Sequence, residues 1–285
     1  MRALCLSGGA AKGAWEAGVC KRLIGDRRRT YKIFTGVSVG TINALRLTEG
    51  RGEAQVGKCA QLIRDWHEIT TDHVYVSKST GYAAAVLTGS LFDMSPLRRF
   101  LEARVNSDAI ARSGNKLLIG AVNMSTKKLE VAREYTPNLI DWAMASSAIP
   151  VIFPLVKIGS DWYGDGGVRD VTLIAQAIML GATEVDIVLA QRLDADDEPW
   201  RPESPRAVPD ILMRLIDTFL TEITEGDLRA VGLRTQVAQL ADRFAHVKLN
   251  LYTPSTDLGD SMSFDPAHVR GMIKRGYIDA IKQES

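Results

Sequence analysis

Gly36-Val37-Ser38-Val39-Gly40 is the segment of this sequence that carries the most structural information. The apolar run from Tyr31 to Val37 predicts a buried strand that leads directly into it, and Thr41 to Leu47 predict the helix that follows. Glycines at both ends permit a sharp strand-to-helix turn, which would lift the Ser38 hydroxyl above the sheet. The segment therefore predicts a nucleophile elbow, although an ordinary Gly/Ser turn can have the same spacing.

Strands and helices alternate along most of the chain. Short apolar runs predict further strands at 2–6, 117–122, 128–133, 185–190 and 247–252. Apolar spacings of three and four predict further helices at 12–23, 54–69, 139–148, 171–180 and 266–281. We expect Ser95 to cap one more helix, with Pro96 at its first position, and Asp170 to cap the helix at 171–180. The alternation predicts a three-layer α/β/α sandwich with a mostly parallel central sheet.

Residues 191 to 209 have a different composition, because a run of acidic residues precedes a proline-rich stretch there. This composition predicts a loop or linker. An amphipathic helix is expected after it, with the apolar stripe Leu212, Leu215, Ile216, Phe219, Leu220 and Ile223. We interpret the stripe as core packing, with a lid or membrane-contact face as the alternative. The chain is thus predicted to be one domain, 1–285, with a lid or helical insert at 191–245.

Composition argues against several classes of function. The formal net charge of +1 gives no electrostatic signature of nucleic-acid binding. The sequence has no signal-peptide pattern and no apolar run of about 18 residues, which predicts a cytoplasmic protein that touches membranes only peripherally. Three cysteines, an odd number without zinc-site spacing, indicate free thiols in a reducing compartment. We expect no metal and no cofactor, and the sequence does not reveal the oligomeric state.

A glycine-rich loop, Ser7-Gly8-Gly9-Ala10-Ala11-Lys12-Gly13, lies between the first predicted strand and its helix. Unpaired backbone N–H groups and the positive end of the helix dipole meet at such a position. The loop could be the oxyanion hole of an acyl-transfer enzyme, or it could hold a nucleotide phosphate. Its spacing differs from that of a P-loop, which favours the oxyanion hole.

The base that would activate Ser38 is less obvious. None of the four histidines has a recognisable catalytic setting, although His246 and His268 lie late enough in the chain to keep a Ser-Asp-His triad as an alternative. Gly164-Asp165-Gly166-Gly167 offers a carboxylate that is held in a turn. Asp165 is therefore a second candidate base.

In combination these segments resemble the patatin-like phospholipase family. Residues 6–13, Leu6-Ser7-Gly8-Gly9-Ala10-Ala11-Lys12-Gly13, resemble the family's G-G-G-x-[RK]-G loop, and residues 36–40 resemble its elbow. Asp165-Gly166-Gly167 is similar to its Asp-Gly-Gly, and residues 145–150, Ala-Ser-Ser-Ala-Ile-Pro, to its A-S-x-A-x-P segment. Segments 92–99 and 264–280 are also similar to bacterial members, so the resemblance covers most of the chain.

The resemblance implies a Ser-Asp dyad, with Ser38 as the nucleophile and Asp165 as its general base. It also implies that the backbone N–H groups of Gly9 and Ala10, together with that of Ala11, hold the oxyanion. The other matching positions would support these motifs: Gly8, Lys12, Gly13, Gly36, Gly40, Gly166 and Gly167. One position departs from the family pattern, since Ala10 replaces the third glycine, and an alanine there is strained if the backbone needs a positive φ.

The function that the resemblance implies is hydrolysis of fatty acyl esters of phospholipids or lysophospholipids through an acyl-serine intermediate. The same dyad could instead serve an acyltransferase or a thioesterase, because the acceptor is chosen by the shape of the pocket. A lipid-binding regulatory module without turnover is the alternative from a different class. The expected partner is a lipid or phospholipid substrate, with peripheral membrane contact and no nucleic acid.

Overall fold

The computed structural model describes residues 1–78, 89–192 and 247–284, together with residues 211, 214, 215, 218, 219, 221–223 and 226. Its strands are β1 Arg2–Leu6, β2 Ile33–Val37, β3 Val76–Ser77, β4 Phe92–Asp93, β5 Lys116–Asn123, β6 Lys128–Arg133, β7 Val156–Ile158, β8 Asp161–Asp165, β9 Glu184–Val188 and β10 Lys248–Tyr252. Its helices are α1 Gly13–Cys20, α2 Val39–Thr48, α3 Ala54–Glu68, α4 Thr71–Val74, α6 Ser95–Glu102, α7 Ser107–Arg112, α8 Leu139–Ser146, α9 Ile174–Met179 and α11 Pro266–Glu284. Short 3₁₀ turns cover Ala10–Lys12 and Gly166–Val168, and a π-helical turn, Lys21–Asp26, extends α1.

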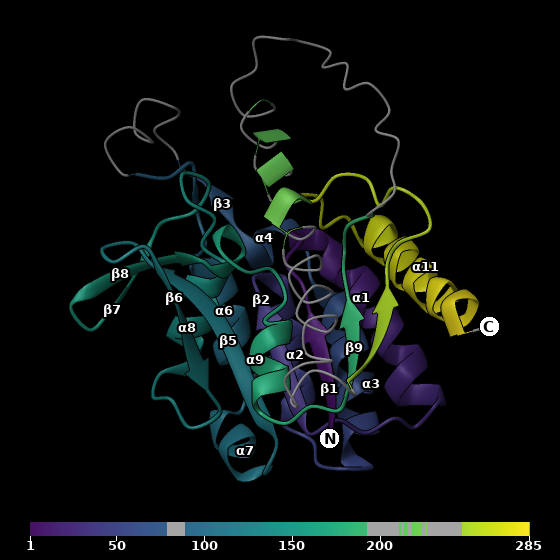
Figure 1. Ribbon diagram of the computed structural model, residues 1–285. Helices are drawn as coiled ribbons and strands as arrows, with labels where there is room; N and C mark the ends of the chain where they lie inside the picture. Colours follow the sequence, from purple (N-terminus) through teal and green to yellow (C-terminus); the bar gives the residue numbers. More distant parts are fainter. Residues whose placement is uncertain are drawn as a thin grey trace.

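One eight-stranded sheet forms the middle layer, with the strand order β10-β9-β1-β2-β5-β8-β7 and β6 paired to β5 (Figure 1). The five strands from β10 to β5 are parallel to one another. β6, β7 and β8 pair antiparallel to their neighbours. The prediction of a mostly parallel sheet is therefore confirmed, with an antiparallel extension at one edge.

Alternate residues of the central strands enter two separate cores, which explains the helices on both faces of the sheet. Leu4, Leu6 and Phe34 belong to the large core on the side of α1, α2 and α3. Ala3 and Cys5 belong to the smaller core that contains residues of α9. The three-layer α/β/α architecture predicted from the sequence is thus confirmed.

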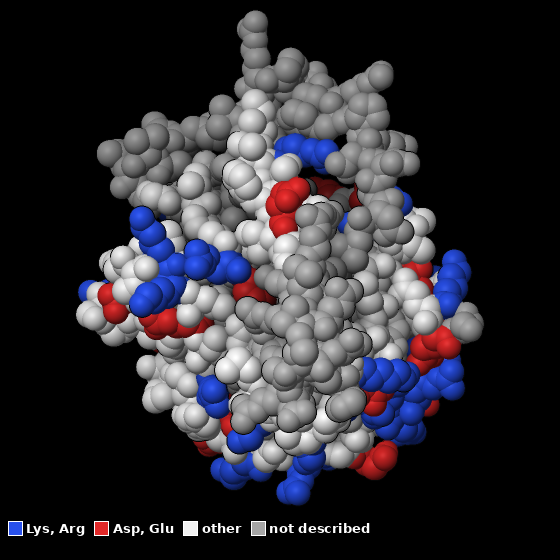
Figure 2. Space-filling model, viewed as in Figure 1, with Lys and Arg blue, Asp and Glu red and all other residues white. Residues whose placement is uncertain are grey.

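The C-terminal helix α11 packs along α1, at the opposite end of the sequence (Figure 1). Glycines allow the two helices to come close, because a Cβ at Gly276 would lie 1.9 Å from the Trp15 carbonyl oxygen. Ion pairs hold the end of α11 against the π-helical turn that extends α1. In one of them, Arg22 lies 2.9 Å from Glu284. Lys and Arg side chains lie among Asp and Glu on the face shown in Figure 2.

The structure corrects the predicted start of two helices. α6 does begin at Ser95, but the capping group is the Asp93 carboxylate, which accepts hydrogen bonds from the Ser95 N–H and hydroxyl. α9 begins at Ile174 rather than at 171, because Leu173 has a φ of 57°. Asp170 accepts from the N–H groups of residues 172 and 173, so it caps a turn that precedes the helix.

The sequence analysis did not predict the hairpin of β7 and β8, and this hairpin carries Asp165. Along one edge of β5, β2 pairs with residues up to Gly120, where Val37 is the partner. β8 approaches the same edge from the opposite direction, and Asp165 pairs with the next residue, Ala121. The ends of β2 and β8 therefore meet at adjacent positions on β5.

Most of the predicted insert at 191–245 lies outside the described residues, as does His246. The described positions between 211 and 223 are helical, which agrees with the expected amphipathic helix. Two residues of its apolar stripe are exposed, Leu215 by 48% and Phe219 by 61%. The interpretation of these two side chains as core packing is therefore wrong. One domain with an insert stays a prediction.

Candidate active site

The elbow places Ser38 at the tip of a tight turn between β2 and α2. Ser38 has a φ of 54° and a ψ of −129°, a conformation that costs a non-glycine residue about 1–3 kcal/mol. The flanking glycines have no room for a side chain: a Cβ at Gly36 would lie 2.5 Å from the Gly40 carbonyl oxygen, and one at Gly40 would lie 2.4 Å from that of Leu6. Close packing of the backbone thus explains both glycines of the motif.

Ser146, at the end of α8, holds the elbow in place. The Ser38 N–H donates to the Ser146 Oγ at 3.0 Å, and the hydroxyls of Thr41 and Ser146 lie 2.9 Å apart. Ser146 is fully buried, so these bonds are shielded from water. The structure thus gives this serine of the A-S-x-A-x-P segment a direct bond to the strained residue.

Asp165 is buried beside Ser38, with 5% of its surface exposed. Its Oδ1 accepts a hydrogen bond of 2.8 Å from the Gly167 N–H. Burial raises the pKa of Asp165 from 3.8 to about 7, while the Gly167 N–H and the Ser38 hydroxyl favour the charged carboxylate. A Cβ at Gly166 would lie 2.3 Å from the Gly120 carbonyl oxygen, so the Asp-Gly-Gly segment is pressed against β5.

The glycine-rich loop lines the same cavity as Ser38 and Asp165. A Cβ at Gly8 would lie 3.2 Å from the Ser38 Cβ, and one at Gly9 would lie 2.9 Å from the Ala190 side chain. Ala10 has a φ of 49°, so the departure from the family's glycine does put an alanine in a left-handed conformation. In the described part of the chain, the N–H groups of Gly9 and Ala10 donate to no other group.

Two further loop residues take other roles. The Ala11 N–H donates to the Ser261 carbonyl oxygen at 2.8 Å. This bond corrects the expectation that Ala11 adds a third donor to the oxyanion hole. Gly13 is needed for close packing, because a Cβ there would lie 2.4 Å from the Val39 side chain. Lys12 lines the cavity above Ser38.

A buried polar network fixes the base of the loop. Glu16 of α1 accepts hydrogen bonds from the Ser7 N–H at 2.9 Å and from the Asn43 side-chain amide at 3.0 Å. Asn43 in turn accepts from the Trp66 indole N–H at 2.8 Å. Desolvation raises the pKa of Glu16 to about 8. The network ties Ser7, the first residue of the glycine loop, to α1, α2 and α3.

The described histidines lie away from Ser38. His67 and His73 are on α3 and α4, and the His73 ring packs against Phe100. His268 is in the first turn of α11, and its Nε2 is buried without a hydrogen-bond partner among the described residues. None of these three lines either cavity that contains Ser38.

Ser38 opens onto two cavities of different shape. The wider one, about 490 Å³, is lined by Gly8, Gly9, Ala10, Lys12, Ser38, Ile149, Pro150, Asp165, Gly167, Val168, Gln191, Phe219, Glu222, Ile223 and Ser261. It therefore combines the elbow, the carboxylate and the free amides of the loop. The exposed Phe219 lines it together with Glu222 and Ile223, so described helical positions from the 211–223 segment border the site.

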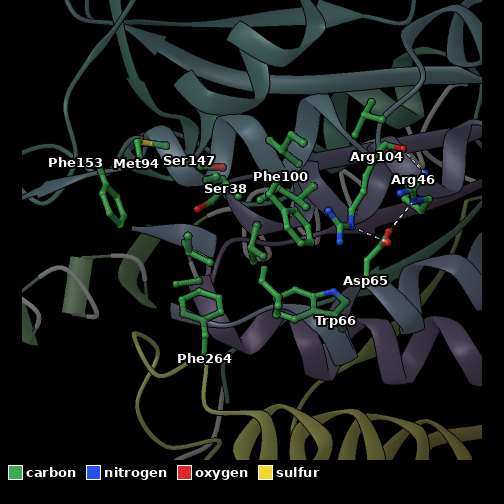
Figure 3. A pocket seen from close by; sticks show the side chains of 18 of the residues that line it. Ser38, Arg46, Asp65, Trp66, Met94, Phe100, Arg104, Ser147, Phe153 and Phe264 are labelled. Atoms are coloured by element: carbon green, nitrogen blue, oxygen red, sulfur yellow. Dashed lines mark hydrogen bonds and ion pairs between the residues drawn. The ribbon is translucent and has the colours of Figure 1, made fainter. Parts of the chain in front are cut away.

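The narrower cavity, about 60 Å³, is a channel between α2, α3 and α6. In Figure 3, Ser38 and Ser147 lie on one side of the view and Arg46, Asp65 and Arg104 on the other, with Phe100 and Trp66 between them. Most of its lining is apolar. A linear apolar group attached to Ser38 would fit such a channel.

The described residues contain no group of three or more His, Cys, Asp and Glu side chains arranged to hold a metal ion. None of their helices has the length and apolar character needed to cross a membrane. All three cysteines are buried and unpaired, as expected for free thiols.

Comparison with known proteins gives three similarities. The model of the patatin-like phospholipase family matches residues 4–178, which include the glycine loop, Ser38 and Asp165. Among curated proteins, the chain is 27% identical over 182 residues to the "probable lipid hydrolase 463L" of Invertebrate iridescent virus 6. That alignment covers 59% of this chain, and the chain spans 60% of the length of that relative.

Among solved structures, the crystal structure of VipD from Legionella pneumophila is similar with a TM-score of 0.42 and 12% identity. That comparison covers 99% of this chain and 66% of VipD. The family model, in contrast, covers more than half of the chain, in the segments that form the elbow, the glycine loop and the Asp-Gly-Gly turn. By that match, the chain belongs to the patatin-like phospholipase family.

Proposed function

We propose that this protein is a carboxylic ester hydrolase that cleaves fatty acyl esters of lipids, of the phospholipase A or lysophospholipase type. The observation that carries the proposal is that β2, which Ser38 follows, and β8, which ends at Asp165, meet at adjacent positions of β5. Ser38 and Asp165 share one cavity with the amides of Gly9 and Ala10, which donate to no other group among the described residues. The family membership and the name of the viral relative point to the same chemistry.

The first half of the reaction forms an acyl-enzyme. The Asp165 carboxylate accepts the hydroxyl proton of Ser38 as Oγ attacks the ester carbonyl carbon. The carbonyl oxygen becomes an oxyanion and accepts hydrogen bonds from the N–H groups of Gly9 and Ala10, each donor typically worth about 10²–10³ in kcat. When the intermediate collapses, the bond to the alcohol oxygen breaks, and Asp165 returns its proton to that leaving oxygen.

The second half returns the enzyme to its starting state. Asp165 takes a proton from water, the water oxygen attacks the acyl carbon, and the same amides hold the new oxyanion. Collapse breaks the bond to Ser38 Oγ, which recovers the proton from Asp165, and the fatty acid is released. A carboxylate can fill this role near neutral pH because burial raises the pKa of Asp165 to about 7.

Two features of the surroundings support a lipid as the substrate. The apolar channel has room for an acyl chain beside Ser38, and the wider cavity has room for the remainder of the lipid. The exposed Phe219 at its edge supports peripheral contact with a membrane. We propose that the protein works in the cytoplasm on a lipid surface, with water as the acyl acceptor.

The test is release of fatty acid from phosphatidylcholine and lysophosphatidylcholine, with a p-nitrophenyl ester and an acyl thioester in parallel. Wild type should hydrolyse the oxygen esters, and Ser38→Ala should reduce the rate to background. His268→Ala is the matched control and should retain wild-type rates, because His268 lies outside both cavities. Faster transfer to an added alcohol or thioester cleavage alone would favour an acyltransferase or a thioesterase. No turnover by folded wild type would contradict the proposal and favour a regulatory lipid-binding module.

A further inference from the structure

Met94 and Phe153 lie on one side of Ser38 (Figure 3), whereas three helices shape the part of the channel that runs from Ser38 to Arg46. Each turns toward it a face whose residues are spaced by three and four, which puts them on one side of a helix. These faces are Val39, Ile42 and Arg46 from α2, Leu62, Asp65 and Trp66 from α3, with Ile69 just beyond its end, and Leu97, Phe100 and Leu101 from α6, with Arg104 just beyond its end. The charged residues of these faces are Arg46, Asp65 and Arg104, and the other residues named are apolar.

Those charged residues form one connected group, the end cluster of Arg46, Asp65 and Arg104. Arg46 Nε lies 2.8 Å from one Asp65 oxygen, and Arg104 Nε lies 3.4 Å from the other. Arg46 also donates to the Arg104 carbonyl oxygen. The guanidinium of Arg104 lies 3.9 Å from the centre of the Phe100 ring, so it covers the last aromatic side chain of the channel.

The end cluster extends from a buried side chain to a partly exposed one. Arg46 is buried, with 8% of its surface exposed. Arg104 is partly exposed and reaches outward to Glu68, at 2.8 Å, whose side chain is 60% exposed. An apolar chain end that reached the cluster would have to strip water and partners from paired charges, which is unfavourable. The cluster is therefore both a physical and an electrostatic limit to the channel.

The length of α2 gives the scale of the channel. Arg46 comes eight residues after Ser38 in the sequence, which corresponds to about 12 Å along a helix. An extended chain of single bonds advances about 1.2 Å per bond, because a fully extended polypeptide advances about 3.3–3.6 Å per residue over three backbone bonds. The path from Ser38 to the cluster thus accommodates about ten bonds.

We propose that the end cluster of Arg46, Asp65 and Arg104 closes the acyl channel and makes the enzyme selective for acyl groups of about 8 to 12 carbons. This inference rests on the proposed function, because it assigns the acyl part of the substrate to the channel. It makes Arg104 and Asp65 specificity-determining residues that act on the far end of the acyl chain.

The test is the ratio of kcat/KM values across p-nitrophenyl esters of 4 to 18 carbons. Wild type should be fastest at about 8 to 12 carbons. Arg104→Ala removes the outer part of the cluster, so the optimum should move by two or more carbons toward longer chains. The 16-carbon to 10-carbon ratio should rise at least about tenfold, since each additional buried methylene changes kcat/KM by about fourfold.

A second variant tests the channel from within. Ile42 lies on the channel face of α2 between Ser38 and Arg46, and the larger side chain of Ile42→Phe should shift the optimum toward shorter chains. Arg98→Ala is the matched control. Arg98 is also on α6 and paired to a carboxylate, Asp141 at 2.6 Å, but it does not line the channel, so the profile should not change.

Thermal melts establish that each variant is folded. If Arg104→Ala is unstable, the change in optimal chain length in Ile42→Phe alone decides whether the inference holds. Folded variants with the wild-type profile would overturn the inference and leave the ester hydrolase intact. Binding of free fatty acids to Ser38→Ala, measured by calorimetry, separates the two proposals: tightest binding at 8 to 12 carbons without any wild-type turnover would reject the hydrolase and retain the channel.

Discussion

The two cavities that meet at Ser38 differ in what they offer a substrate. The wider one carries a carboxylate, backbone donors and a partly exposed rim. The narrower one is lined by apolar side chains up to its charged end. Ala10, Ser38 and Ile149 belong to both. The difference suggests that bond cleavage and chain selection occupy opposite sides of one residue, so substitutions should separate them.

The largest effect is expected at Asp165. Asp165→Asn retains an oxygen that can accept from the Gly167 N–H but removes the base, so kcat should fall by about 10³-fold or more. The chain-length profile of any residual activity should stay as in wild type, because Asp165 does not line the channel. A change in profile with little loss of kcat would break the separation between the two cavities.

The same variant should change how stability depends on pH. The raised pKa means that folded Asp165 binds its proton more tightly than the unfolded chain does, so its contribution to stability falls as the pH rises from about 4 to 7. Asp165→Asn lacks this loss. The free energy of unfolding in urea should therefore rise for the variant relative to wild type between pH 4 and pH 8. The expected rise is about 1.4 kcal/mol per unit of pKa shift. A constant difference would contradict the raised pKa.

The pH dependence of catalysis is the next largest effect. Because the charged carboxylate is the active form, kcat/KM should fall about tenfold per pH unit below the pKa of about 7 and level off above it. Esters of short and long acyl chains should give the same acidic limb of the kcat/KM profile, because Asp165 lines the wider cavity and not the acyl channel. A limb near pH 4 would mean that Asp165 is solvated in the free enzyme.

Two adjacent buried serines give a matched pair with a smaller effect. Ser146 accepts from the Ser38 N–H, whereas the Ser147 Oγ has no partner among the described residues. Ser146→Ala should lower the free energy of unfolding by about 1–3 kcal/mol, because it orphans a buried donor. Ser147→Ala should not destabilise the protein. Equal losses in denaturant titrations would remove the special role of Ser146 at the elbow.

The smallest effect concerns the alanine that lines both cavities. Ala10→Gly removes the strain of an alanine in a left-handed conformation, which should stabilise the folded state by about 1–2 kcal/mol. Glycine also makes the unfolded chain more flexible, which should destabilise the folded state by about 0.4–1 kcal/mol. The net change should be a gain of up to about 1.6 kcal/mol. Ala11→Gly, at an ordinary φ, should instead lose stability. The opposite order of melting temperatures would show that the loop is not strained at Ala10.

The sequence predicted the parts of the site that are locally encoded. The elbow depends on Gly36 and Gly40, whose contacts lie mostly within the β2–α2 turn and the neighbouring β1. Cores on both faces of the sheet follow from alternating apolar residues in β1 and β9. Short-range patterns of this kind survive in the fold because each is consistent with its surroundings.

Long-range contacts account for what the sequence did not predict. The hairpin that carries Asp165 is short and has an exposed Trp162, so it lacks the alternation of a buried strand. Ala11 is engaged by Ser261, a residue far along the chain, and nothing local indicates that bond. The channel faces of α2, α3 and α6 have the same spacing as core-facing residues, so only their arrangement in space reveals the cavity.

The most direct test of the central claim is intact-mass analysis after incubation with an alkyl fluorophosphonate, followed by peptide mapping. We expect one adduct, on Ser38, in wild type and in His268→Ala. Labelling should be much slower in Asp165→Asn and absent in Ser38→Ala. An adduct on another residue, or none on folded wild type, would contradict the claim that Asp165 activates Ser38 as a nucleophile.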